Sequence, residues 1–191
     1  MFAVVAFSMS YGEKYDIGSV DTKIFTNTKM NESKDGKIYI SYVVGDESGS
    51  RYRFISFQGE HFQYNMMVSD QMVKALKKFL KWGKIADKNK IYKARTVTTT
   101  RTVTWARSLK NNKVIPVALE IVMTFLPSKE KKVLHMQMYL VTDKDNREEK
   151  NVVSYSLGFL SKQAKEILEI ISEKNVKKKV KQIKKENSLF E

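Results

Sequence analysis

The stretch VSDQMVKALKKFLKWG (residues 68–83) decides the predicted fold, together with its counterpart LSKQAKEILEI (160–170), which lies 92 residues later. In the first stretch, apolar residues recur at the spacing of one helical face, Ser69 is suited to an N-cap and Gly83 to a C-terminal end. The spacing predicts a helix over 70–82. The second stretch has the same kind of apolar face, so one helix is predicted in each half of the chain.

Strands are predicted before each helix, because apolar and polar residues alternate there and β-branched and aromatic types are frequent. The expected strands of the first half are 1–9, 19–29, 37–45 and 51–58, and those of the second half are 93–107, 114–126, 132–142 and 151–160. The second helix is predicted to begin near Ser161, its candidate N-cap.

The predicted fold class is therefore α+β, with two β-β-β-β-α repeats related by a pseudo-twofold axis. Each repeat, 1–84 and 91–185, is expected to form an antiparallel four-stranded sheet packed against its helix. The repeats are expected to share one compact unit, 1–191. The lysine-rich run 174–185 is predicted to prolong the second helix, followed by a short tail, 186–191. An unrelated α+β domain with eight strands in another order is the alternative.

The amino-acid composition of the chain makes some classes of function more plausible than others. The chain has 191 residues, with 35 Lys and Arg against 21 Asp and Glu, and its formal net charge of +14 favours anionic partners. It has no cysteine and only His61 and His135, so metal sites, cofactors and enzymatic activity are not expected. No apolar run approaches the length of a membrane span, and no small-molecule substrate is evident. An intracellular location, cytoplasmic or nucleoid-associated, is expected.

The segment KARTVTTTRTVTWAR (93–107) carries the main candidate site. Strict alternation would place threonines on one face and Arg95, Arg101, Trp105 and Arg107 on the other. Guanidinium groups bind phosphates and aromatic planes stack on unpaired bases, so this combination is typical of single-strand binders. The alternative is an edge strand whose charges prevent aggregation.

Similar basic and aromatic residues occur in other predicted strands, where a solvated sheet face is the alternative interpretation. The candidate nucleic-acid-binding residues outside the 93–107 segment are Lys23, Phe25, Lys37, Tyr39, Arg51, Arg53 and Tyr139.

The run Lys34-Asp35-Gly36-Lys37-Ile38-Tyr39-Ile40, between Lys23-Ile24-Phe25 and Arg51-Tyr52-Arg53-Phe54, resembles a PUR repeat. Residues 36–41 are also similar to the lysine-glycine-lysine strand motif of Whirly proteins, with Asp35 inserted. The order of predicted elements resembles these families over the whole chain, whereas the sequence motif is similar only over residues 20–80. This resemblance implies binding of single-stranded nucleic acid.

The expected function is therefore non-enzymatic, sequence-tolerant binding of single-stranded DNA or RNA by a homo-oligomer. Lys and Arg would contact phosphates while aromatic side chains stack on bases. The alternative is a structural or assembly protein, such as a viral or plasmid-encoded scaffold, that uses its sheet edges and its lysine-rich helix.

Overall fold

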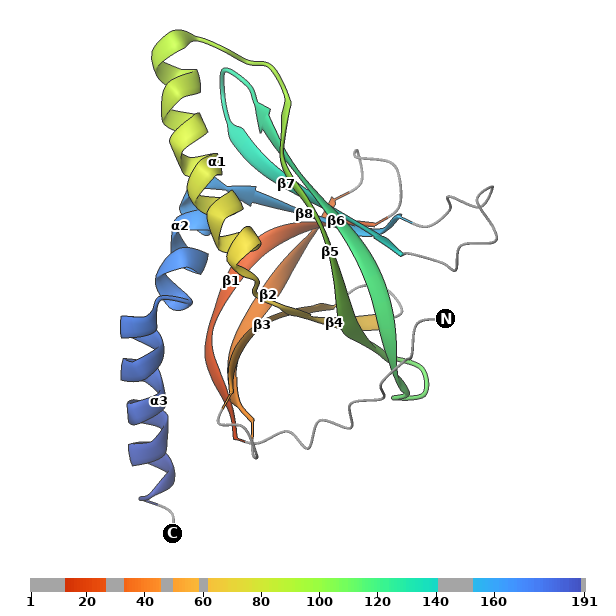
Figure 1. Cartoon of the computed structure of the whole chain (residues 1–191), viewed down its shortest axis with the longest axis vertical. Helices are drawn as coiled ribbons and strands as arrows, with labels where there is room; N and C mark the ends of the chain where they lie inside the picture. Colours follow the sequence, from red (N-terminus) through yellow and green to blue (C-terminus); the bar gives the residue numbers. More distant parts are fainter. Residues whose placement is uncertain (1–12, 27–32, 46–49, 59–61, 141–152, 190–191) are drawn as a thin grey trace.

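The computed structural model describes residues 13–26, 33–45, 50–58, 62–140 and 153–189 (Figure 1). The strand predicted at 1–9 and His61 lie outside these residues. The elements, in chain order, are β1 (Lys14–Thr26), β2 (Ser33–Val44), β3 (Arg51–Gln58), β4 (Phe62–Met67), α1 (Asp70–Asn89), β5 (Arg95–Ser108), β6 (Val114–Pro127), β7 (Lys132–Leu140), β8 (Val153–Leu160), α2 (Ser161–Ile170) and α3 (Glu173–Asn187).

The strands form one closed antiparallel barrel in the order β1 to β8, and the predicted pair of separate sheets is wrong. Each strand pairs with the next, β4 pairs with β5, and β1 closes the barrel by pairing with β8, where Ile24 lies opposite Leu157. The two halves therefore share a single sheet, and neither has a four-stranded sheet with a helix of its own. Four described strands and then a helix occur in each half, but in the first half the fourth strand is β4, which was not predicted, and the strand predicted at 1–9 is not among the described residues.

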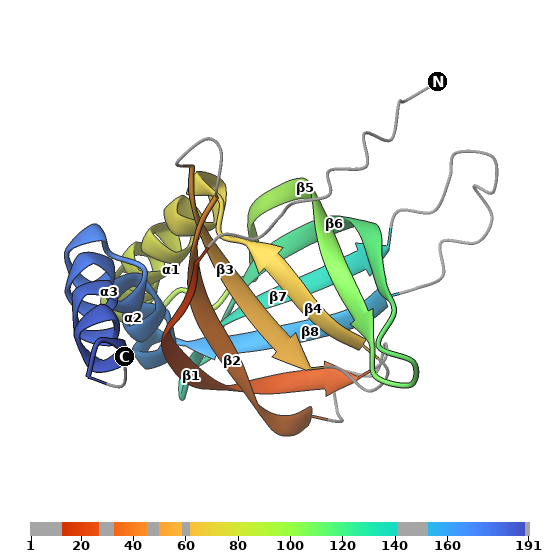
Figure 2. The same cartoon turned by 90° about the horizontal axis from the view of Figure 1, so that it is seen from below.

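The three helices lie together on one side of the barrel (Figures 1 and 2). Helix α1 contacts α2 and strands β5, β6 and β7, whereas α2 contacts β1, β7 and β8. Helix α1, from the first half, thus packs on strands of the second half, and α2 contacts strands of both halves, so one shared core replaces two separate ones.

Helix α1 begins as predicted and ends later than predicted. The Ser69 hydroxyl accepts a hydrogen bond from the Met72 amide at 3.2 Å, as an N-cap does. The helix continues through Gly83 to Asn89 and ends at Lys90, whose φ of 55° is left-handed. Gly83 is buried, and a Cβ there would lie 4.0 Å from the Ser161 hydroxyl of α2, so this glycine faces the α1–α2 contact.

The lysine-rich C-terminal run forms a separate helix rather than an extension of α2. Helix α2 ends at Ile170, and Ser172 caps the start of α3 by accepting a hydrogen bond from the Asn175 amide at 3.3 Å. Val176 is buried, so α3 is held against the body by its narrow apolar side.

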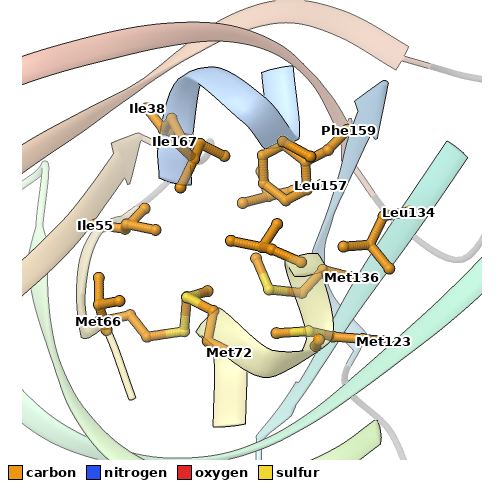
Figure 3. Close-up of a cluster of buried hydrophobic side chains, with 14 of the residues drawn as sticks. Ile38, Ile55, Met66, Met72, Met123, Leu134, Met136, Leu157, Phe159 and Ile167 are labelled. Carbon is orange, nitrogen blue, oxygen red and sulfur yellow. The ribbon is translucent and has the colours of Figure 1, made fainter. Parts of the chain in front are cut away.

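The core fills the barrel with aliphatic, methionine and aromatic side chains. Ile38, Ile40, Ile55 and Met136 are fully buried strand residues. Figure 3 shows Met72 of α1 and Ile167 of α2 in the same cluster as strand side chains from both halves. Flexible methionine side chains suit such an irregular meeting of helices and strands.

Of the described helices, none is long and apolar enough to pass through a membrane.

Candidate nucleic-acid interface

The pairing register places Tyr39 and Trp105 on one face of the barrel. Tyr39 lies opposite Ser56, Ser56 opposite Asn65, and Asn65 opposite Trp105. Direct cross-strand partners point to the same side of a sheet, so the row runs along one face from β2 to β5. Three strand spacings separate the backbone positions of the two residues by about 14 Å. The face is the outer one, because its neighbour Ile38 alternates with Tyr39 and is fully buried.

Exposed apolar side chains surround this row. Tyr39 is 54% exposed, Val103 is 65% exposed and Met67 is 41% exposed, although side chains of these sizes are usually buried. Phe54 lies opposite Met67 in the β3–β4 pair. Tyr39, Phe54, Met67, Val103 and Trp105 lie on the outer face of neighbouring strands, and we call them the outer aromatic patch. Tyr39, Met67 and Val103 are exposed and Phe54 and Trp105 are half-buried, which makes the patch a candidate binding surface.

Sequence reasoning missed Phe54 and Met67 as members of the patch. The segment 62–67 was not predicted as a strand, so Met67 had no assigned face. Phe54 alternates with Arg53 and therefore points away from it. The alternation within β3 was the available signal, and it separates Phe54 from both Arg51 and Arg53.

Three of the predicted cations lie beside the patch. Lys37 is two residues from Tyr39 and its ammonium group lies 3.5 Å from the Asp21 carboxylate. Arg101 pairs with Glu120 at 2.9 Å. Arg107 is exposed, two residues from Trp105, and makes no ion pair with any described residue.

The two ion pairs of these cations leave them accessible. The side chains of Lys37 and Arg101 are 48% and 76% exposed. Exposed pairs are worth at most about 1 kcal/mol, so a phosphate can replace the carboxylate partner at small cost.

Lys23, Phe25 and Tyr139 lie outside the patch. Lys23 is on the outer face of β1, with its ammonium group 2.5 Å from the Asp35 carboxylate. Tyr139 is half-buried on β7 and lies opposite Glu120. Phe25 belongs to β1, but its side chain lies outside the described part of the structure.

Arg51, Arg53 and Arg95 are on the opposite face from the patch. Arg53 lies opposite Tyr42, and its Nη1 donates a hydrogen bond to the Ile171 carbonyl at 2.8 Å, where α2 ends. Arg51 shares the face of Arg53, because the two are two residues apart on one strand. These arginines face the helices and are not grouped with Tyr39.

A β-bulge explains the position of Arg95. Thr96 lies opposite Thr124 and Thr98 opposite Met123, so Val97 is an extra residue in β5. Because of this extra residue, the β5 residues before Val97 point to the opposite face from the one that strict alternation predicts. Arg95 therefore lies opposite the buried Phe125. The strict alternation expected for 93–107 holds only after the bulge.

Most of the net charge lies on the helices rather than on the strands. Helix α1 has six lysines and two aspartates, a net charge of +4, and α3 has seven lysines and two glutamates, a net charge of +5. Helix α2 is neutral, with two of each sign. These helices account for +9 of the +14 carried by the whole chain.

The described carboxylates and His135 are the remaining candidates for metal ligands. In the described parts of the chain, no three His, Asp or Glu side chains gather in a group that could hold a metal ion. His135 is 3% exposed, and its burial lowers the pKa of the imidazole and favours the neutral form.

Known proteins give no guide to the use of this surface. No protein-family model matches the chain, and no curated protein or solved structure shows significant similarity to it.

Proposed function

We propose that the chain is a non-enzymatic protein that binds single-stranded DNA or RNA through the outer aromatic patch and its neighbouring cations. The supporting observation is the row that brings exposed Tyr39 and half-buried Trp105 to one face, with Lys37, Arg101 and Arg107 beside it. Stacking planes among cations are the combination that single-strand binders use with little regard to base sequence. The resemblance of residues 20–80 to PUR and Whirly strands supports the same function.

The spacing of the patch suits several nucleotides rather than one. Stacked nucleotides rise by about 3.4 Å each, so the roughly 14 Å between Tyr39 and Trp105 corresponds to about four nucleotides. The outer surface of a closed barrel is convex, which leaves bases to contact the rings one after another. Arg107 and Lys37 would then hold phosphates on the side of the row away from Val103.

The lysine-rich helices add a second, less specific contribution. Their charge would attract a polyanion over a longer range and would accelerate association at low salt. Each phosphate contact releases counterions, so affinity should fall steeply as salt rises.

Fluorescence anisotropy with a labelled single strand, measured at two salt concentrations, tests this function. Tyr39→Ala and Trp105→Ala should each weaken binding by about 1–3 kcal/mol, the contribution of one stacked base. Tyr92→Ala is the matched control, because Tyr92 lies in the α1–β5 connection, away from the patch. The proposal fails if the unaltered protein does not bind at low salt, or if all three variants weaken binding equally.

Assembly of copies or partners is the second candidate function, favoured by the exposure of Met67, Val103 and Val114 on neighbouring strands. Such an assembly would involve faces rather than sheet edges, because the described strands leave no unpaired edge in the barrel. Light scattering of the protein and of Val103→Lys distinguishes the two functions. If the function is assembly, the unaltered protein should be an oligomer and Val103→Lys should be a smaller species. Both results should hold with and without oligonucleotide.

A further inference from the structure

A pocket of about 540 Å³ lies between α3 and strands β1, β2 and β3, on the opposite side of the sheet from the outer aromatic patch. This volume is within the range of small-molecule sites. The residues that line the pocket are Glu13, Tyr15, Tyr42, Val44, Arg51, Val176, Lys177, Val180, Lys181 and Lys184.

The strand side of the pocket is aromatic. The rings of Tyr15 and Tyr42 lie 6.5 Å apart and are tilted by 36°. Val176 and Val180 add apolar surface from α3, one helical turn apart. Tyr15 is only 5% exposed and the Lys184 ammonium group lies 5.6 Å from its ring centroid, whereas Tyr42 is half-buried. A flat apolar group of a ligand can therefore contact Tyr42 on one side and aliphatic side chains on the other.

The rim of the pocket has an excess of positive charge. Its one carboxylate, Glu13, is neutralised locally: it accepts a hydrogen bond from the Tyr15 hydroxyl and lies 3.0 Å from the Lys184 ammonium group. These interactions lower the pKa of Glu13, with the Tyr15 hydrogen bond as the largest cause, so the carboxylate stays ionised and paired. Lys177 is similarly engaged, 2.7 Å from Glu173 outside the pocket.

Two cations of the rim remain available. Arg51 and Lys181 line the pocket, are exposed, and make no ion pair with the described residues. The charge of Arg51 lowers the pKa of Glu173, although Lys177 is the main cause, so Arg51 influences a carboxylate that it does not pair with. A guanidinium and an ammonium at one rim are suited to a phosphate, which accepts several charge-assisted hydrogen bonds.

We infer that this pocket binds a nucleotide, with the base against Tyr42 and the phosphate at Arg51 and Lys181. The Tyr42 ring favours a planar heteroaromatic group over a flexible acyl chain. The solvent-exposed rim, where the Lys184 side chain is 57% exposed, suits a ligand whose sugar and phosphate remain in water. The nucleotide is either free or one residue of a strand, and the inference does not depend on strand binding by the outer aromatic patch.

Isothermal titration of the full chain with adenosine 5′-monophosphate tests the inference. Ribose 5-phosphate lacks the base and adenosine lacks the phosphate, so each should bind at least about tenfold more weakly than the nucleotide. Equal affinity for the nucleotide and ribose 5-phosphate would overturn the inference, because it would show that the Tyr42 ring takes no part. Undetectable binding of the nucleotide would overturn it as well.

Charge variants assign the binding to this pocket. Arg51→Gln and Lys181→Gln should each weaken nucleotide binding by about tenfold. Lys178→Gln is the matched control, since Lys178 is an exposed lysine of α3 that does not line the pocket. Lys181 is on the exposed side of a helix, so its variant tests the site even if Arg51→Gln fails to fold. Equal effects of all three variants would show charge attraction alone and would refute the inference.

Competition identifies the source of the nucleotide. If adenosine monophosphate displaces a labelled oligonucleotide, the pocket holds one residue of a strand; if both bind together, it holds a free nucleotide. Both results support the pocket. Trp105→Ala should leave nucleotide affinity unchanged, so failure of strand binding at the outer aromatic patch can be recognised separately.

Discussion

Arg53 and Arg107 should behave oppositely when each is replaced by glutamine, although both are strand arginines of the kind expected to bind nucleic acid. Arg53 donates a hydrogen bond to the Ile171 carbonyl at 2.8 Å, next to Ser172, which caps α3. Its loss would leave the junction of α2 and α3 without this link to β3. Arg107 is on the outer face and makes no ion pair within the described structure.

The expected cost of Arg53→Gln follows from the type of hydrogen bond that is lost. Bonds to charged groups contribute about 1.5–3 kcal/mol, and the lower end applies because the Arg53 side chain is only half-buried. For a chain of this length, about 1.5 kcal/mol lowers the thermal midpoint by roughly 3–6 °C. Arg107→Gln should change the free energy of unfolding by less than about 0.5 kcal/mol, as exposed surface substitutions usually do.

Thermal unfolding followed by circular dichroism measures the first effect, and fluorescence anisotropy with a single strand measures the second. Arg107→Gln should weaken oligonucleotide binding and reduce the salt dependence by about one counterion. Arg53→Gln should leave the oligonucleotide affinity and its salt dependence nearly unchanged at temperatures below the lowered unfolding midpoint of this variant.

One result would refute the reasoning. If Arg53→Gln unfolds at the original temperature and loses oligonucleotide affinity while Arg107→Gln keeps it, the helix-facing side of β3 is the binding surface. The assignment of faces from the pairing register would then carry no functional meaning.

Two further predictions concern the β1–β2 pair and its contact with α3. Gly36→Ala should destabilise the protein by about 1–3 kcal/mol, because the new methyl group would overlap the buried Ile24 side chain; an unchanged urea midpoint would mean that Ile24 moves aside. The Tyr15 hydroxyl and Lys184 lower the pKa of Glu13, so its contribution to stability is present above about 4.5, the ordinary value, and is lost as pH falls through the lowered pKa. The stability difference between the protein and Glu13→Gln should therefore shrink below pH 4.5, and a difference that stays constant to pH 2 would contradict this.

The sequence contained enough local information to predict most elements but not how they assemble. Ser69 and the apolar spacing behind it located the start of α1, and alternation located β3, β5 and β6 within a few residues. Closure of the barrel depends on pairing between β4 and β5 and between β1 and β8, and these contacts leave no periodic signal within either strand. Helix α1 passes Gly83 because packing against α2 compensates for a residue that weakens an isolated helix.

The face of each candidate site residue could be predicted where apolar and polar residues alternate along the strand without a bulge. Arg101, Trp105 and Arg107 share the outer face because no bulge lies between them. Tyr39 and Lys37 were placed on their face by the fully buried Ile38 and Ile40. Arg53 could not be distinguished from a surface cation, because its partner is a backbone carbonyl 118 residues away.

The extra residue in β5 has a consequence for how such a surface can change. Val97 separates an arginine facing the helices from two arginines facing solvent. Deletion of Val97 would restore alternation but would keep Thr96 and Thr98 opposite Thr124 and Met123, so Arg95 would stay opposite Phe125 and would still face the helices. The extra residue can therefore be lost over generations without any change in which arginines of β5 face solvent.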